Sequence, residues 1–76
     1  MNRDRRKALA AIRIQLYDLH DLLEEVQQEE EEYRDNIPEN LQGSERYEKA
    51  DEACDNLYSA ISSLEEVIEY IDAAVE

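Results

Sequence analysis

Apolar side chains recur at alternating spacings of three and four residues through both halves of the chain. The row in the second half has no polar interruption and contains Tyr47, Ala50, Cys54, Leu57, Ile61, Leu64, Ile68, Ile71 and Val75. The row in the first half contains Leu9, Ile12, Leu16, Leu19, Leu23 and Val26, meets Glu30 and resumes at Tyr33. This spacing is typical of helices that pack along a seam. It predicts two long helices, at about residues 3–35 and 44–75.

The segment between these ranges contains the residues that interrupt helices. Pro38 and Gly43 are the only proline and the only glycine of the chain, and Ser44 is a preferred N-cap residue. Gly43 admits a positive φ, and Asn36 is a favourable helix end before Ile37 and Pro38. A loop at residues 36–43 is short enough to make the two helices antiparallel neighbours. We therefore expect residues 1–76 to form a single all-α domain, a long antiparallel two-helix hairpin.

In a lone hairpin, each helix shields only one side of its partner's apolar stripe. A further row on the second helix widens the apolar face and contains Ala53, Ala60, Val67 and Ala74. Such a wide face favours a four-helix bundle over a two-stranded zipper, so we expect two hairpins to dimerise. The expected core and dimer seam consists of Leu9, Ile12, Leu16, Leu19, Leu23, Val26, Leu57, Ile61, Leu64, Ile68 and Ile71.

Charge is distributed unevenly along the chain. There are 8 Lys and Arg against 21 Asp and Glu, a net charge of −13 at neutral pH. Residues 1–13 carry five basic side chains and one acidic, whereas residues 24–55 carry thirteen acidic side chains and three basic. This balance argues against direct nucleic-acid binding, because phosphate contacts require Lys and Arg.

The acids of the middle segment are candidate contacts for a basic surface on another protein. The candidates are Glu24, Glu25, Glu29, Glu30, Glu31, Glu32, Asp51, Glu52 and Asp55. The alternative is a solvated acidic face that only keeps the protein soluble. Glu30 occupies a seam position, where it is either solvated or paired to fix the register of the helices.

Several apolar side chains lie off the predicted seam. Ile14 and Tyr17 form a stripe with Ala10 on the first helix, and Tyr58 and Tyr70 lie off the seam of the second. Tyrosine buries a large area while keeping a polar tip, and it is enriched among residues that dominate binding energy. Ile14, Tyr17, Tyr58 and Tyr70 are therefore candidate anchors for a partner. The alternative is that the rings lie flat along the flank of the bundle.

The residues needed for catalysis or metal binding do not occur in useful patterns. Di-iron sites in bundles use Glu-x-x-His pairs, but His20 has no Glu three residues before it and is expected on the helix flank. Cys54 falls on the seam without a nearby His base, which predicts a buried, inert thiol. We therefore expect a protein that is not an enzyme and holds no metal or cofactor.

The sequence also predicts where the protein works. A single cysteine forms no internal disulfide, which suits a reducing cytoplasm. No apolar run approaches the ~20 residues needed to cross a membrane, and no signal-peptide pattern follows the basic start. We expect a cytoplasmic protein without membrane contact.

Three segments of the chain resemble a known group of proteins: the head at residues 2–7, the loop at residues 38–46 and the tail at residues 55–70. They look like a family of small acidic helical proteins encoded in phages, prophages and conjugative elements of Gram-positive bacteria. The resemblance implies an accessory protein of a mobile element in a bacterial cytoplasm, and it implies no established activity. Small acidic proteins in that setting include inhibitors of host defence nucleases, some of which mimic DNA.

These observations predict a non-catalytic phage or mobile-element protein that blocks a basic surface of a host nucleic-acid-handling or defence enzyme. It would be an acidic inhibitor, a DNA mimic such as an anti-CRISPR or other anti-defence protein. The acids would supply long-range attraction and the anchors a desolvated contact. The alternative function is a structural or regulatory homodimer without inhibitory activity, in which the apolar stripes serve self-association.

Overall fold

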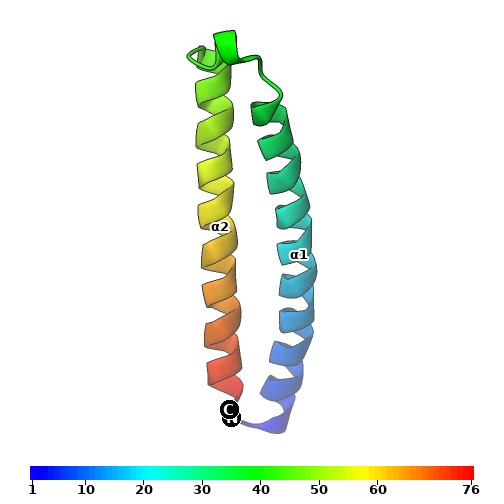
Figure 1. Ribbon diagram of the computed structural model, residues 1–76. Helices are drawn as coiled ribbons and strands as arrows, with labels where there is room; N and C mark the ends of the chain where they lie inside the picture. The colour runs from blue at the N-terminus through cyan, green and yellow to red at the C-terminus, as the bar shows by residue number, and fades with distance from the viewer.

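The structure is a computed structural model that describes residues 1–76 as a long helical hairpin (Figure 1). Helix α1 spans Arg3–Asp35, the 3-10 helix η1 spans Glu39–Leu41, and helix α2 spans Glu45–Val75. The two long helices lie side by side and antiparallel, and both chain ends lie opposite the connection (Figure 1). The Cα atoms extend over 59 × 15 × 13 Å. The all-α hairpin expected from the sequence is confirmed, and neither helix contains a stretch apolar enough to span a bilayer.

Both long helices begin at side-chain caps. The Asn2 side chain accepts a hydrogen bond of 2.8 Å from the backbone N–H of Arg5. The Ser44 hydroxyl accepts one of 3.3 Å from the backbone N–H of Tyr47. Such caps satisfy donors that a helix leaves free in its first turn. The start of α2 therefore follows from Ser44 itself.

The connection between the helices is closed by an apolar residue. Asn36 ends α1, and its backbone N–H donates to the Glu32 carbonyl at 3.0 Å. The next residue, Ile37, is only 3% exposed and closes the loop end of the hairpin. Gly43 permits a positive φ, but no residue of the chain has one. No atom lies within 4 Å of the place where a Gly43 Cβ would be, so this position does not require glycine.

The apolar row predicted for the second helix faces α1. Its members Ala50, Cys54, Ile61 and Ile68 are buried, and the others, Tyr47, Leu57, Leu64, Ile71 and Val75, are half-buried. Together with Ile37, these four form the entire set of buried residues. Helix α1 contributes none. The core of the hairpin is therefore a narrow line, and most apolar side chains keep part of their surface in solvent.

The face that α1 turns toward α2 differs from the predicted seam. Leu9, Leu16 and Leu23 are half-buried as members of that seam, but the other members, Ile12, Leu19 and Val26, are 44%, 53% and 49% exposed. Polar residues take their place: Arg13, His20, Gln27 and Arg34 are half-buried. Each follows Leu9, Leu16, Leu23 or Glu30 by four residues, so it shares that side of the helix. Long polar side chains can occupy such a position because their stems are apolar and their heads reach partners or water.

Candidate interaction surfaces

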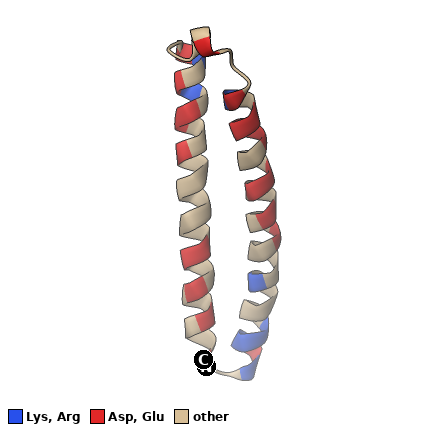
Figure 2. Ribbon diagram, viewed as in Figure 1, with Lys and Arg blue, Asp and Glu red and all other residues tan.

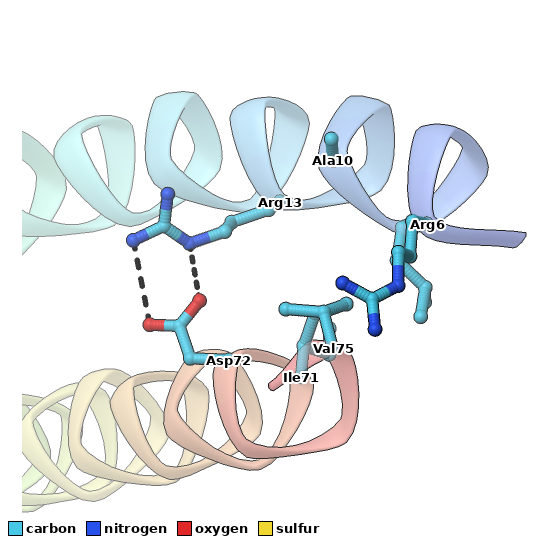
Figure 3. Close-up of a pocket in the computed structure, with 7 residues that line it drawn as sticks. Arg6, Ala10, Arg13, Ile71, Asp72 and Val75 are labelled. Carbon is cyan, nitrogen blue, oxygen red and sulfur yellow. Dashed lines mark hydrogen bonds and ion pairs between the residues drawn. The ribbon is translucent and has the colours of Figure 1, made fainter. Parts of the chain in front are cut away.

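Polar side chains pair across the helices along one edge of the hairpin, which we call the polar edge. Arg13 forms an ion pair with Asp72, with Nη2 3.3 Å from Oδ2 (Figure 3). The Nη1 atom of Arg34 lies 3.0 Å from Oδ1 of Asp51. Between them, His20 Nε2 lies 3.5 Å from a carboxylate oxygen of Glu65.

These pairs keep a constant register. His20 comes seven residues after Arg13, and its partner Glu65 comes seven residues before Asp72. Arg34 comes fourteen residues after His20, and Asp51 comes fourteen before Glu65. The heptad repeat thus carries charge pairs along this edge as regularly as it carries apolar contacts in the core. The polar edge fixes how far α1 can slide along α2.

The two arginines of the polar edge are firmly held cations. A hydrogen bond to Asp72 is the main cause that raises the pKa of Arg13. A hydrogen bond to Asp35 is the main cause that raises the pKa of Arg34, and a hydrogen bond to Asp51 adds to it. Both guanidinium groups are therefore charged at any pH at which the protein folds.

Two tyrosines stack on arginines. Tyr17, a predicted partner anchor, receives a hydrogen bond from Arg13 Nη2 at 3.4 Å, and its ring centre lies 5.0 Å from the guanidinium carbon. Tyr33 receives one from Arg46 Nε at 2.7 Å, with the ring centre 5.2 Å from that guanidinium carbon. The second contact joins α1 to α2 next to the loop. Tyr17 thus helps to position the Arg13 side chain on the polar edge.

The other predicted anchors do not gather at one place. Ile14, Tyr58 and Tyr70 are 64%, 66% and 76% exposed. Tyr58 lies seven residues from both Asp51 and Glu65 and therefore on the polar edge. Tyr70 lies one turn from Val67, on the other side of α2. Ile14 and Tyr17 are neighbours one turn apart on α1, whereas Tyr58 and Tyr70 lie on two different sides of α2, so the four anchors named from the sequence form no single contact surface.

An exposed apolar surface lies opposite the polar edge, and we call it the apolar face. It consists of Ile12, Leu19, Leu22 and Val26 of α1 with Leu64 and Val67 of α2. At its centre is a groove lined only by apolar side chains, those of Leu19, Leu22, Leu23, Val26 and Leu64.

Leu22 was not singled out from the sequence, although a signal for it existed. Leu19, Leu22, Leu23 and Val26 follow one another at spacings that place four side chains on one side of a helix. Strict alternation of three and four residues selects a narrow seam and omits Leu22. The wider helical pattern would have identified this face.

The predicted acidic residues surround the loop end and do not share one face (Figure 2). Successive residues of a helix point about 100° apart, so the run from Glu29 to Glu32 covers all sides of α1. Glu30 and Glu31 are half-buried and form no ion pair with Lys or Arg. Asp51 is half-buried and pairs with Arg34. The remaining candidates are exposed, namely Glu24, Glu25, Glu29, Glu32, Glu52 and Asp55.

His20 is buried more deeply than its expected place on the helix flank. Its side chain is 14% exposed, because it points between the helices toward Glu65. His20, Asp21 and Glu24 bring one ligand atom each within 4.8 Å of one another. Both carboxylates are exposed and come from the same helix turn as the imidazole. These residues are the ones that could approach a divalent cation.

Cys54 is a buried thiol, 3% exposed. Burial is the main cause that raises its pKa, and nearby Glu30 and Glu31 add to the rise. The register of the polar edge places Cys54 level with Glu31, eleven residues or about 16 Å along α1 from His20. The thiol therefore has neither the low pKa nor the imidazole partner of a nucleophilic cysteine.

A shallow cleft opens at the terminal end of the hairpin, between the start of α1 and the end of α2 (Figure 3). Ile71 and Val75 form its apolar wall, and Arg6 and Arg13 border it. Arg13 is paired with Asp72, and Arg6 Nε donates to the Met1 carbonyl at 3.1 Å.

No family model, curated protein or solved structure matches this chain.

Proposed function

We propose that the protein is a non-catalytic binding protein that engages and blocks a basic surface of another protein. The observation that carries the proposal is the excess of unpaired carboxylates at the loop end. Of the acids in residues 24–55, only Asp35, Asp51 and Glu45 pair with a Lys or Arg. The third basic residue of the segment, Arg46, is bound to Tyr33. The other acids are therefore free to interact with charges on a partner.

The density of this charge supports mimicry of nucleic acid. Residues 24–55 hold thirteen acidic and three basic side chains, a net charge of −10. At the rise of an α-helix, the segment with its loop occupies about 20–25 Å of the hairpin, which gives about one net charge per 2–2.5 Å. Duplex DNA carries about one charge per 1.7 Å of axis. A groove shaped to attract a phosphate backbone would attract this end of the hairpin.

The arrangement of the acids supports a particular order of events in binding. Carboxylates on all sides of α1 create a field that does not depend on the rotation of the rod, so they favour a fast first encounter. Affinity then requires desolvated contacts, which exposed side chains such as Ile14 and Tyr58 would provide. The resemblance to acidic proteins of phages and conjugative elements supports a host nucleic-acid-handling or defence enzyme as the target.

A capture experiment tests the proposal. The tagged protein is incubated with a nuclease-treated bacterial lysate and washed at low and high salt, and bound proteins are identified by mass spectrometry. Bound protein should be released by high salt and by excess duplex DNA. A variant with Glu29, Glu30, Glu31 and Glu32 replaced by Lys should lose it.

The matched control carries the same change in net charge elsewhere. It replaces Asp18, Glu66, Glu69 and Glu76 by Lys, all of them exposed and outside residues 24–55. The control should retain the captured protein. Equal capture by both variants, or failure of duplex DNA to compete, contradicts a specific role for the acidic loop end.

The exposed apolar face favours a second candidate function, a structural or regulatory homodimer. In that case charge serves only solubility, and reversal of Glu29–Glu32 should leave every function of the dimer unchanged. A clean homodimer that captures no protein from lysate would support this second function.

A further inference from the structure

We infer that the apolar face is covered by a second copy of this chain, turned so that the two loops lie at opposite ends of the dimer. This inference concerns the side of the hairpin that the proposed function does not use. It uses the charge of the acidic loop end to set the orientation of the two copies, but it does not require that this end bind another protein. Three properties of the hairpin carry it: the extent of the side that holds the apolar face, the symmetry of the residues on that face and the distribution of charge.

The side of the hairpin that carries the apolar face has the extent that a stable dimer needs, and the apolar face occupies the middle of it, about 21 Å along α1 from Ile12 to Val26. The hairpin is 59 Å long and 15 Å wide. One side of such a rod has a projected area on the order of 900 Å², and a standard interface buries about 800 Å² per partner. The hairpin itself buries only five residues. A second copy would bury the three exposed members of the predicted seam, Ile12, Leu19 and Val26.

The residues of the face are symmetric about its centre. The outer row of α1 reads Arg5, Ile12, Leu19, Val26 and Tyr33, with Leu19 in the middle. A two-fold axis perpendicular to α1 at Leu19 pairs Leu19 with its copy and Ile12 with Val26 of the partner subunit. On α2 the register of the polar edge places Val67 near the same level, so Val67 also meets its copy. Both helices thus present self-complementary rows to one axis, as an isologous interface requires.

Apolar packing alone also permits the opposite arrangement, with both loops at one end. That arrangement rotates one hairpin about the long axis and places α1 against α2 of the partner, so that Leu19 meets Val67 of the partner subunit. It also places two loop ends side by side, each with a net charge of −10. At the other end, the basic head of each copy lies beside Asp72 and Glu76 of its own α2, so only a small net positive charge is left there.

Charge decides between the two arrangements. With the loops at opposite ends, the head of one copy, with Arg3, Arg5 and Arg6, lies along the acidic loop end of the other (Figure 2 shows Lys and Arg at the start of α1, and Asp and Glu toward the loop and along the end of α2). The acidic loop end of each copy then meets the basic head of the other, whereas in the other arrangement the two acidic loop ends, each with a net charge of −10, repel each other. The dimer still carries an excess of acids at each end, because each head supplies fewer charges than the loop end it meets.

Distances between spin labels test the arrangement directly. Nitroxide labels are attached at Asn40→Cys in the loop or at Asp18→Cys near the proposed axis, each in a Cys54→Ala background. With the loops at opposite ends, the Asn40 labels should lie beyond about 40 Å and the Asp18 labels within about 20 Å, given the helix rise and the spacing of packed helices. An Asn40 distance equal to or shorter than the Asp18 distance overturns the proposed orientation.

Mass and mutation test the face itself. Light scattering of the native chain should give twice the chain mass of 8.9 kDa. Leu19→Glu should give a helical monomer, because Leu19 is exposed in the hairpin and buried in the dimer. The control Ile14→Glu, on the opposite side of α1, should leave the dimer intact. A monomeric native chain, or a dimer that Ile14→Glu breaks and Leu19→Glu does not, overturns the proposal.

A milder variant keeps the test decisive if Leu19→Glu fails to fold. Leu19→Ala preserves helix propensity and removes most of the side chain at the axis. It should raise the dissociation constant of the dimer by at least about tenfold, because the residue meets its own copy and is lost twice. Sedimentation equilibrium measures this change. An unchanged dissociation constant places the interface elsewhere and contradicts the proposal.

Discussion

The polar edge and the apolar face of the hairpin repeat with the same heptad period but have different roles. On the polar edge, Arg13 and Arg34 find their partners Asp72 and Asp51 within the same chain. On the apolar face, Leu19 and Val26 find none and stay about half exposed. One edge is therefore complete in a single hairpin, and the other needs a further surface to cover it. The comparison shows that a heptad repeat specifies spacing, whereas the residue type decides whether a row closes the hairpin or joins it to something else.

The largest expected effect comes from the buried row of α2, which lies between the polar edge and the apolar face. Ile61→Asp places an unpaired carboxylate at one of the few buried positions, which costs about 3–5 kcal/mol. The helical circular dichroism signal should be largely lost at 25 °C. The control Ile14→Asp changes an exposed residue and should retain the native signal. A folded Ile61→Asp variant with native thermal stability would show that the buried line of α2 does not hold the hairpin.

A charge swap tests whether the polar edge sets the register. Arg13→Asp brings two carboxylates together where an ion pair existed, so the melting temperature should fall by several degrees. Adding Asp72→Arg restores opposite charges in reversed order and should recover most of this loss. Thermal melts at low and high salt measure both changes. If the double variant is no more stable than Arg13→Asp alone, the pair does not act through charge.

Replacing His20 by an apolar residue makes the polar edge more like the apolar face. His20 is largely buried between the helices and flanked along α1 by Leu16 and Leu23. His20→Leu should stabilise the hairpin by about 1 kcal/mol in urea unfolding, because an apolar side chain replaces a polar one that burial disfavours. His20→Ala, which fills no space, should not stabilise it. A destabilised His20→Leu variant would mean that contacts of the imidazole with Glu24 and Glu65 outweigh apolar packing.

The smallest expected effect concerns the thiol in the core. Burial raises the pKa of Cys54, so the native thiol should react with iodoacetamide more slowly than the urea-unfolded chain at every pH up to its raised pKa. The folded chain holds the Cys54 proton more tightly than the unfolded chain does. The contribution of this thiol to the free energy of unfolding should therefore be fully present below the ordinary thiol pKa of about 8.5. This contribution should be lost as the pH rises from the ordinary thiol pKa through the raised pKa of the folded chain. Cys54→Ala should remove this part of the decline. Equal reaction rates in the folded and unfolded chain would contradict burial.

The fold was predictable because local signals agreed with one another. The N-cap Ser44 and the breaker Pro38 mark the helix ends at the loop, and the row from Ala50 to Ile68 identifies the side of α2 that is buried. Such agreement between capping, turn residues and period is what makes a sequence specify one structure.

The orientation of α1 and the shape of the candidate site were not predictable by the same rules. Hydrophobicity alone placed Ile12, Leu19 and Val26 toward α2, but a hairpin can bury only part of a wide apolar stripe. Cross-helix pairing of Arg13 and Arg34 turned α1 so that its polar row faces α2. The acids were expected to form one face, although four consecutive Glu residues on a helix cannot do so. Both differences arise where long-range pairing or helix geometry competes with a one-dimensional pattern.

The position of Ile37 implies a gradient of local opening along the rod. Ile37, Ala50 and Cys54 are three of the five buried residues, and all lie toward the loop end. The first turn of α1 and the last turn of α2 contain no buried residue. Hydrogen exchange should therefore be slowest near the loop and fastest where the helices fray at the chain ends. In a dimer with opposed loops, each fraying end would rest against the most protected end of its neighbour, and exchange would become uniform from end to end.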